Sequence, residues 1–180
     1  MTAERVPVVG DLATQFREGM AHLGAGVCVI TSNGPAGLLG FTATAVSSVT
    51  DAPPTLLVCM NRVSTQNAAL KRNGVLCVNV LAGEHADLSS LFAGATQDMA
   101  ERFAAATWTY GTLGVPRLAS AVASFDCRVA QSQEVGTHSV LFGQVADVEI
   151  TDEEEALIYL SRAYHRVRRL GHNRGGIMAS

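Results

Sequence analysis

Charged side chains are scarce in this sequence: they make up 16% of the 180 residues, against 48% hydrophobic residues, and the formal net charge is −3. Domains that bind nucleic acids usually present a strongly basic face, so no nucleic-acid partner is expected. The one basic cluster, Arg166-Val167-Arg168-Arg169, is interpreted as part of a solvated chain end. No apolar run approaches the ~20 residues of a membrane span, so no membrane contact is expected either.

Paired cysteines are absent as well. Cys28, Cys59, Cys77 and Cys127 lie far apart in the sequence, and each sits in an apolar run. Zinc sites favour closely spaced cysteine pairs, so no metal site is predicted. The four thiols are expected to be reduced core residues of a cytoplasmic protein. The first ten residues agree with that location, because they lack the charged-then-apolar layout of a signal peptide.

The familiar nucleotide-binding and catalytic motifs are missing too. The sequence has no G-x-G-x-x-G after a strand and no G-x-x-x-x-G-K-[ST]. It also lacks the G-x-S-x-G elbow and the H-E-x-x-H motif. A dinucleotide, if one binds here, therefore does not bind in the Rossmann manner.

Short β-branched runs separated by turn residues dominate what is present, with too few helices between them for a parallel βαβ series. This pattern predicts a mainly β, antiparallel barrel with short peripheral helices. The length suits one domain, expected over 13–170 between an N-terminal tail (1–12) and a flexible C-terminal tail (171–180). The low charge fraction also suggests a surface buried in a homo-oligomer. Strands are predicted over 27–31, 38–46, 55–60, 75–81, 121–133 and 139–150.

Four short helices are predicted. The first, over 13–23, places Phe16, Met20 and Leu23 on one face. Ser64 is the expected N-cap of a second helix that ends near Asn73-Gly74. The segments 84–92 and 98–106 are the other two. Residues 151–154 read as a capping box, but the following 157–160 suits a strand equally well, and the pattern leaves both open.

Two polar stretches suggest a ligand site. Residues 40–50 form a strand of small and hydroxyl-bearing side chains, which would let a flat ligand approach the backbone. Residues 59–66 end a strand and begin the helix capped by Ser64, where unpaired N–H groups attract phosphate. If Pro53-Pro54 marks a tight connection, the two strands are neighbours and their polar groups converge. The alternatives are an ordinary polar strand and an ordinary helix cap.

Two further stretches carry candidate residues. His138 follows the turn glycine Gly136 and opens a strand, although a lone histidine is more often structural than functional. Arg162-Ala163-Tyr164-His165-Arg166 is an aromatic and cationic cluster that either covers a ligand or lies on the surface.

Taken together, these stretches resemble the flavin reductases of two-component monooxygenases, a family with the FMN-binding split-barrel fold. The resemblance covers nearly the whole chain, and the block through Pro53-Pro54 is specific to the family. Within the family, the sequence is similar to the FMN reductase of the uracil pathway and to the reductase component of 4-hydroxyphenylacetate 3-monooxygenase. Ser47 and Ser48 depart mildly from these relatives, which leaves the partner oxygenase open. The segments that carry the resemblance are 40–46, 48–61, 76–81, 101–103, 124–128, 136–138 and 164–165.

The resemblance implies a Greek-key split barrel that forms a homodimer and takes hydride from NADH onto FMN, with FAD possible. It implies that reduced flavin then passes to a separate oxygenase. It implies that His138, Arg162 and Tyr164 lie near the nicotinamide substrate, with His138 positioning the ring rather than acting as acid or base. The flavin-binding residues that it implies are Thr42, Ala43, Thr44, Ala45, Val46, Ser47, Cys59, Met60, Asn61, Ser64, Thr65, Gln66, Asn79, Val80 and Leu81.

Two other functions remain open from the sequence. One is a non-enzymatic flavin- or haem-binding barrel, which the absence of an obvious acid–base pair does not exclude. The other is a related barrel oxidase acting on a vitamin-like phosphate. That function would need more basic residues near the phosphate than Arg62, the only one nearby.

Overall fold

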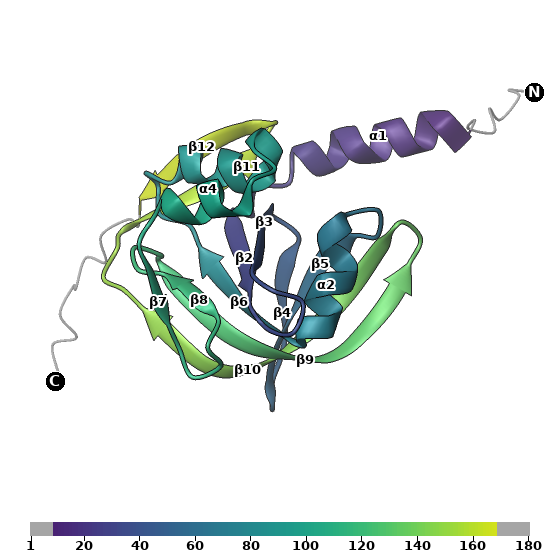
Figure 1. The fold of residues 1–180 in the computed structure, drawn as a ribbon. Helices are drawn as coiled ribbons and strands as arrows, with labels where there is room; N and C mark the ends of the chain where they lie inside the picture. Colours follow the sequence, from purple (N-terminus) through teal and green to yellow (C-terminus); the bar gives the residue numbers. More distant parts are fainter. Residues whose placement is uncertain (1–8, 169–180) are drawn as a thin grey trace, which may run out of the picture.

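A computed structural model describes residues 9–168, and strands dominate it (Figure 1). Seven strands form one antiparallel sheet in the order β3-β2-β6-β9-β10-β5-β4, so the predicted antiparallel, mainly β fold is confirmed. The strands of this sheet are β2 (Cys28–Ser32), β3 (Leu39–Ala43), β4 (Val46–Asp51), β5 (Pro54–Asn61), β6 (Val75–Val80), β9 (Ala123–Val135) and β10 (His138–Ile150).

The curvature of the sheet comes from its two longest strands, β9 and β10, which wrap around one side of the barrel in Figure 1. Their pairing shifts register between Phe142 and Gly143 and again between Val145 and Asp147. Such bulges bend a strand and increase its twist. The curved sheet encloses an apolar core that includes Ile30, Val58, Leu76, Val78 and Leu141.

The strand predicted over 38–46 is interrupted, and this correction defines the fold. Residues up to Ala43 pair with β2, whereas Val46 and its successors pair with β5 at the other edge of the sheet. The link Thr44–Ala45 therefore crosses from one sheet edge to the other, where the barrel is split. Beyond it, Asp51 pairs with Pro54 across the β4–β5 turn. The expectation that the strands flanking Pro53-Pro54 are neighbours is confirmed.

The helix α2 (Thr65–Asn73) forms where the sequence predicts it, with both of its caps. The Ser64 side chain accepts a hydrogen bond from the Gln66 backbone N–H, and Gly74 ends the helix at φ 68°. That left-handed conformation favours glycine.

The helix predicted over 84–92 is replaced by a shorter α3 (Ala86–Ser90) and a π-helical turn, η1 (Leu91–Ala95). Gly94 lies at φ 118° inside this turn, a conformation open only to glycine without strain. After it, α4 (Met99–Ala104) starts at the N-cap Asp98, within the predicted range 98–106.

The first helix, α1 (Val9–Ala21), starts four residues before the predicted boundary, so residues 9–12 belong to it rather than to a tail. It extends away from the barrel (Figure 1). Leu12, Phe16 and Met20 fall on one face, and their exposed fractions are 57%, 65% and 47%. The tail predicted over 171–180 lies outside the described residues.

Two small sheets complete the fold. One has the order β1-β11-β12, built from Ala25–Gly26, Glu155–Leu160 and Ala163–Arg168. The open choice over 157–160 is thus settled as a strand, and 151–154 is a loop rather than a helix start. The other sheet pairs β7 (Trp108–Tyr110) with β8 (Pro116–Leu118). Over residues 9–168, no helix has the length and apolar character needed to cross a membrane.

Candidate functional site

A pocket of about 580 Å³ opens where the Thr44–Ala45 link, the end of β5 and the start of α2 meet. We call it the central pocket. The η1 turn forms a further side. Its lining residues are Phe41, Thr42, Ala43, Thr44, Ala45, Cys59, Met60, Asn61, Ser64, Thr65, Gln66, Phe92, Ala93, Gly94, Gln97, Arg102 and His138.

The β3 side of the central pocket is built from small residues held by main-chain bonds. The Cys59 N–H donates to the Ala45 carbonyl over 2.9 Å, which joins the link to β5. The Thr42 hydroxyl donates to the Ser89 carbonyl over 2.6 Å, so toward a ligand this hydroxyl can only accept a hydrogen bond. A Cβ atom on Gly40 would lie 2.6 Å from Phe92 Cε1. Only glycine at position 40 therefore lets η1 approach β3 this closely.

The start of α2 is fastened to the same strand. The Gln66 side-chain oxygen accepts a hydrogen bond from the Gly40 N–H over 3.1 Å. The side-chain NH₂ of Gln66 is left as a donor toward the pocket. The two polar stretches expected to converge, 40–50 and 59–66, do meet here: residues 42–45 and 59–61 line one pocket together with Ser64, Thr65 and Gln66.

His138 enters the central pocket from the tip of the β9–β10 hairpin. It pairs with Asn61 of β5, and its Nδ1 lies 2.9 Å from the Thr137 hydroxyl. The Glu134 carboxylate fastens this tip to α2, because it lies 2.8 Å from Arg62 Nε and 2.5 Å from Lys71 Nζ. The hydrogen bond from Lys71 is the main cause of the lowered pKa of Glu134. The hairpin tip, and His138 with it, is thus held against the last turn of α2 and the segment before the helix.

The chemistry available in the central pocket is limited. None of its lining side chains is a carboxylate, so it contains no carboxylate-based acid–base pair. Within residues 9–168, no group of three or more histidine, cysteine or acidic side chains is placed to hold a metal. Such a pocket suits a ligand that brings its own reactivity and needs only to be bound and oriented.

A second cleft of about 800 Å³ lies between α1 and the Thr44–Ala45 link, and both link residues line it as well. We call it the α1 cleft. Val46 and Ser47, predicted to bind flavin, and Arg162, predicted to bind the dinucleotide, line this cleft rather than the central pocket. The Arg162 guanidinium lies 2.6 Å from the Glu18 carboxylate of α1, which fastens the helix to the turn between β11 and β12. Thr44 and Ala45 are thus shared by the linings of the two cavities.

Four predicted residues line neither cavity. Asn79 is fully buried, accepts from the Leu118 N–H (2.8 Å) and the Ser124 hydroxyl (3.0 Å), and donates to the Val29 carbonyl (3.0 Å), so its side chain holds strands together. Val80 packs against the barrel core, and Leu81 is fully buried in a second apolar cluster.

Tyr164 is the fourth. Its hydroxyl lies 2.8 Å from Ser89 Oγ, and its ring packs beside the second apolar cluster. Since the Ser89 carbonyl accepts from Thr42, Tyr164 supports the central pocket from behind rather than facing it.

The sequence interpretation missed the side of the pocket formed by Phe92, Ala93, Gly94, Gln97 and Arg102. The only signal for it was Glu101-Arg102-Phe103, which matches the family but was given no role in the site. Periodicity predicts a regular helix over 84–92, and nothing in that pattern indicates a π turn facing β3.

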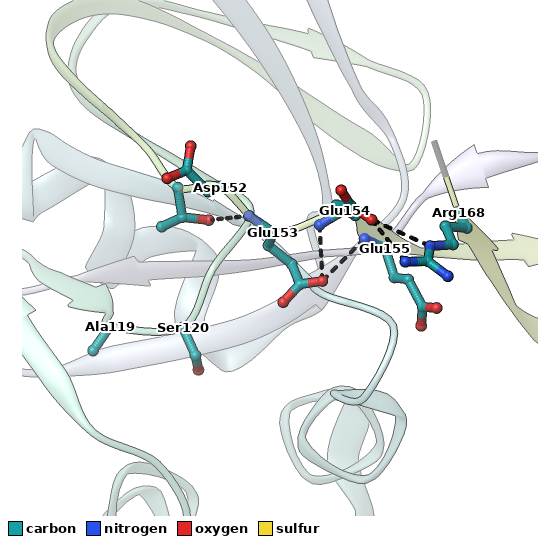
Figure 2. Close-up of a pocket in the computed structure, with 8 residues that line it drawn as sticks. Ala119, Ser120, Asp152, Glu153, Glu154, Glu155 and Arg168 are labelled. Atoms are coloured by element: carbon teal, nitrogen blue, oxygen red, sulfur yellow. Dashed lines mark hydrogen bonds and ion pairs between the residues drawn. The ribbon is translucent and has the colours of Figure 1, made fainter. Parts of the chain in front are cut away.

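A third cavity, of about 450 Å³, shares no lining residue with the other two and is rimmed by acidic side chains (Figure 2). Two of its carboxylates bind neighbouring groups of the chain. The Glu153 carboxylate accepts from the backbone N–H groups of Glu154 and Glu155, and Glu154 pairs with Arg168 over 2.8 Å. These contacts shape the loop that leads into β11, and we assign no ligand to this acidic pocket.

The four cysteines are free thiols, and three of them are buried, as the sequence predicts. Burial raises the pKa of Cys28 and of Cys127 to about 12, and it raises that of Cys77 further. Cys59 is the exception, because it is only partly buried and lines the central pocket.

Comparison with known proteins agrees with this geometry. The family model for the flavin reductase like domain matches residues 20–168. The chain is 52% identical over 154 residues to the 4-hydroxyphenylacetate 3-monooxygenase reductase component of Pseudomonas aeruginosa, covering 85% of this chain and 91% of that protein. It is 54% identical over 159 residues to the FMN reductase (NADH) RutF of Stutzerimonas stutzeri, covering 88% and 89%.

Among solved structures, the fold is similar to that of BorF, the flavin reductase component of a bacterial two-component tryptophan halogenase. The TM-score is 0.80 at 27% identity, over 88% of this chain and 99% of that one. The matched region contains every strand of the seven-stranded sheet and every residue that lines the central pocket. This chain belongs to the flavin reductase like domain family.

Proposed function

We propose that this chain is an NADH-dependent flavin reductase, which transfers hydride from NADH to FMN, or to FAD, and releases reduced flavin to a separate oxygenase. One observation carries the proposal: the central pocket joins small-residue walls and hydroxyl groups, with no carboxylate and no metal-binding cluster among its described residues, in a chain of the flavin reductase like domain family. The relatives' names, FMN reductase (NADH) and monooxygenase reductase component, support the same reaction.

The residues of the central pocket fit a flavin. Ala43, Thr44 and Ala45 leave room for a planar ring to lie against the chain, and Ala93 and Gly94 keep the η1 side equally small. Polar groups are available around this surface from Thr65, from the NH₂ of Gln66 and from Asn61. A ring that exposes carbonyl and nitrogen edges needs such donors beside an apolar face.

A bound flavin supplies the hydride acceptor, N5 of its ring, to the C4 hydride of reduced nicotinamide. This chain's residues orient the two rings and keep water away. Thr44 and Ala45 line both cavities, so ligands in the central pocket and in the α1 cleft can meet at this link. His138 positions the nicotinamide from the hairpin tip, and Arg162 holds the dinucleotide from the α1 cleft.

The test is NADH oxidation by the purified chain, followed at 340 nm with and without added FMN. A flavin reductase is expected to oxidise NADH only when flavin is present, and at a rate that saturates with flavin concentration. FMN binding without catalysed oxidation of NADH or NADPH would instead favour the non-enzymatic flavin-binding barrel. No flavin binding at all would exclude both.

The proposal includes a homodimer. The helix α1 has only 13 residues, projects from the barrel and leaves its apolar face uncovered (Figure 1). Isolated helices shorter than ~12–15 residues are marginal in water, so α1 needs a surface to pack on. Met20 and Leu23, which line the α1 cleft together with Thr44 and Ala45, extend this apolar face. A second copy of the chain would cover this face.

The four free thiols further favour a cytoplasmic location.

A further inference from the structure

Arg102 is a buried cation that has no counter-charge among residues 9–168. Its side chain is 3% exposed, and it lines the central pocket from α4. No described carboxylate forms a salt bridge with its guanidinium, although Glu101 precedes it and binds the Thr96 hydroxyl instead. Burial lowers the pKa of Arg102 from a value so high that the side chain remains charged at neutral pH.

The guanidinium is held by backbone carbonyls of three segments. Nη1 donates to Gly40 over 2.9 Å and to Phe92 over 3.5 Å, while Nε and Nη2 both donate to Thr96. Four of its five N–H groups are thereby used. For the fifth, on Nη2, no acceptor is found among residues 9–168. The cation is thus fixed in position with one donor to spare.

If this residue only held β3 and η1 together through hydrogen bonds, an uncharged side chain would serve. Buried charges in proteins are normally paired, because removing an ion from water is costly unless an opposite charge compensates. The central pocket offers no carboxylate, so among residues 9–168 only neutral carbonyls satisfy Arg102 and no opposite charge is paired with it. The counter-charge is therefore expected to arrive with the ligand.

We infer that Arg102 recognises the phosphoryl group of a flavin mononucleotide, and this inference rests on the proposed function of the central pocket. Arg102 and Gln66 bind the carbonyl and the N–H of the same residue, Gly40, so both approach the same outer edge of β3. The Ser64–Gln66 segment therefore lies at the same end of the pocket as the guanidinium. A phosphoryl group there would meet a fixed cation together with amide and hydroxyl donors, a combination that favours phosphate.

Binding of oxidised FMN and of riboflavin, measured by quenching of flavin fluorescence without NADH, tests this assignment. The two ligands differ only in the phosphate. Wild-type protein is expected to bind FMN at least about tenfold more tightly than riboflavin, the range of a charge-assisted contact. Equal affinities for the two ligands would overturn the assignment without any variant.

Arg102→Gln should remove most of the preference for FMN while changing riboflavin affinity by less than about threefold. Arg102→Lys keeps the charge and should retain a preference for FMN over riboflavin. This variant also tests the role of the charge if Arg102→Gln does not fold. Arg62→Gln is the matched control, because Arg62 lies beside α2 but is paired with Glu134 outside the pocket. It should leave the FMN-to-riboflavin ratio unchanged.

Two further results would overturn the inference. Equal loss of both ligands in Arg102→Gln would show that the residue is only a clamp between β3 and η1. A raised KM for NADH with an unchanged FMN-to-riboflavin ratio would assign the charge to the dinucleotide instead. In either case, flavin-dependent NADH oxidation by the wild-type protein would still support the proposed function, so the two claims fail separately.

Discussion

Replacing Ala45 by tryptophan should abolish flavin binding while leaving the fold intact. Ala45 is exposed in the link between β3 and β4, and it lines both the central pocket and the α1 cleft. An indole there would occupy the surface against which we place the ring. FMN affinity is expected to fall at least about a hundredfold, equivalent to about 2.7 kcal/mol. Isothermal titration with FMN measures the loss.

Ala119→Trp provides the control for this substitution. Ala119 is also an exposed alanine that lines a cavity, but that cavity is the acidic pocket (Figure 2). Surface substitutions of this kind usually change stability by no more than about 0.5 kcal/mol, so both variants should melt near the wild-type temperature. FMN binding should be lost in Ala45→Trp and retained in Ala119→Trp. Loss of FMN binding in Ala119→Trp but not in Ala45→Trp would place the flavin in the acidic pocket and contradict the account.

A second large effect is expected at α1, where Phe16→Glu should convert a dimer into a monomer. Phe16 is 65% exposed in the single chain and lies at the centre of the apolar face between Leu12 and Met20. Aromatic residues at the centre of an interface often contribute about 2 kcal/mol or more, and a buried glutamate adds a desolvation cost. Dimerisation should weaken at least about a hundredfold, as measured by light scattering over a dilution series.

Thr14→Glu introduces the same charge on the opposite side of α1, since positions 14 and 16 differ by about 200° around a helix. It should leave the dimer intact. Phe16→Glu should also reduce helix content in circular dichroism, because α1 would lose the surface that covers its apolar face. A wild-type chain with the mass of one 18.9 kDa copy at all concentrations would refute the dimer.

Local sequence signals predicted the parts of the site that depend on neighbouring residues. The Ser64 cap and the Gly74 end of α2 follow from side-chain and backbone preferences within one turn, and both are found. Likewise, the turn at Pro53-Pro54 predicted that β4 and β5 are paired, which brings residues 42–45 and 59–61 together. Family resemblance supplied the identity of the ligand.

Features that depend on the whole sheet could not be predicted. The interruption at Thr44–Ala45 arises because Ala43 pairs with Cys28 while Val46 pairs with Val58 at the opposite edge of the sheet. The pattern of apolar and polar residues within 38–46 does not indicate this break. The resemblance to the family implied that Asn79 borders the flavin. Its amide instead satisfies buried groups from β2, β8 and β9, which is the commoner fate of such a residue.

The central claim is that a flavin lies against Thr44–Ala45 and the end of β5, and Cys59 reports on it most directly. Cys59 is the one cysteine that lines the central pocket, whereas Cys28, Cys77 and Cys127 are buried and have raised pKa values. Thiolates are the reactive form, so a short pulse of iodoacetamide should alkylate Cys59 in preference to the other three. Mass spectrometry of the labelled peptides then follows the rate at Cys59 as FMN is added. We predict that FMN slows this rate with the same half-saturation concentration as its own binding; an unchanged rate at saturating FMN would contradict the account.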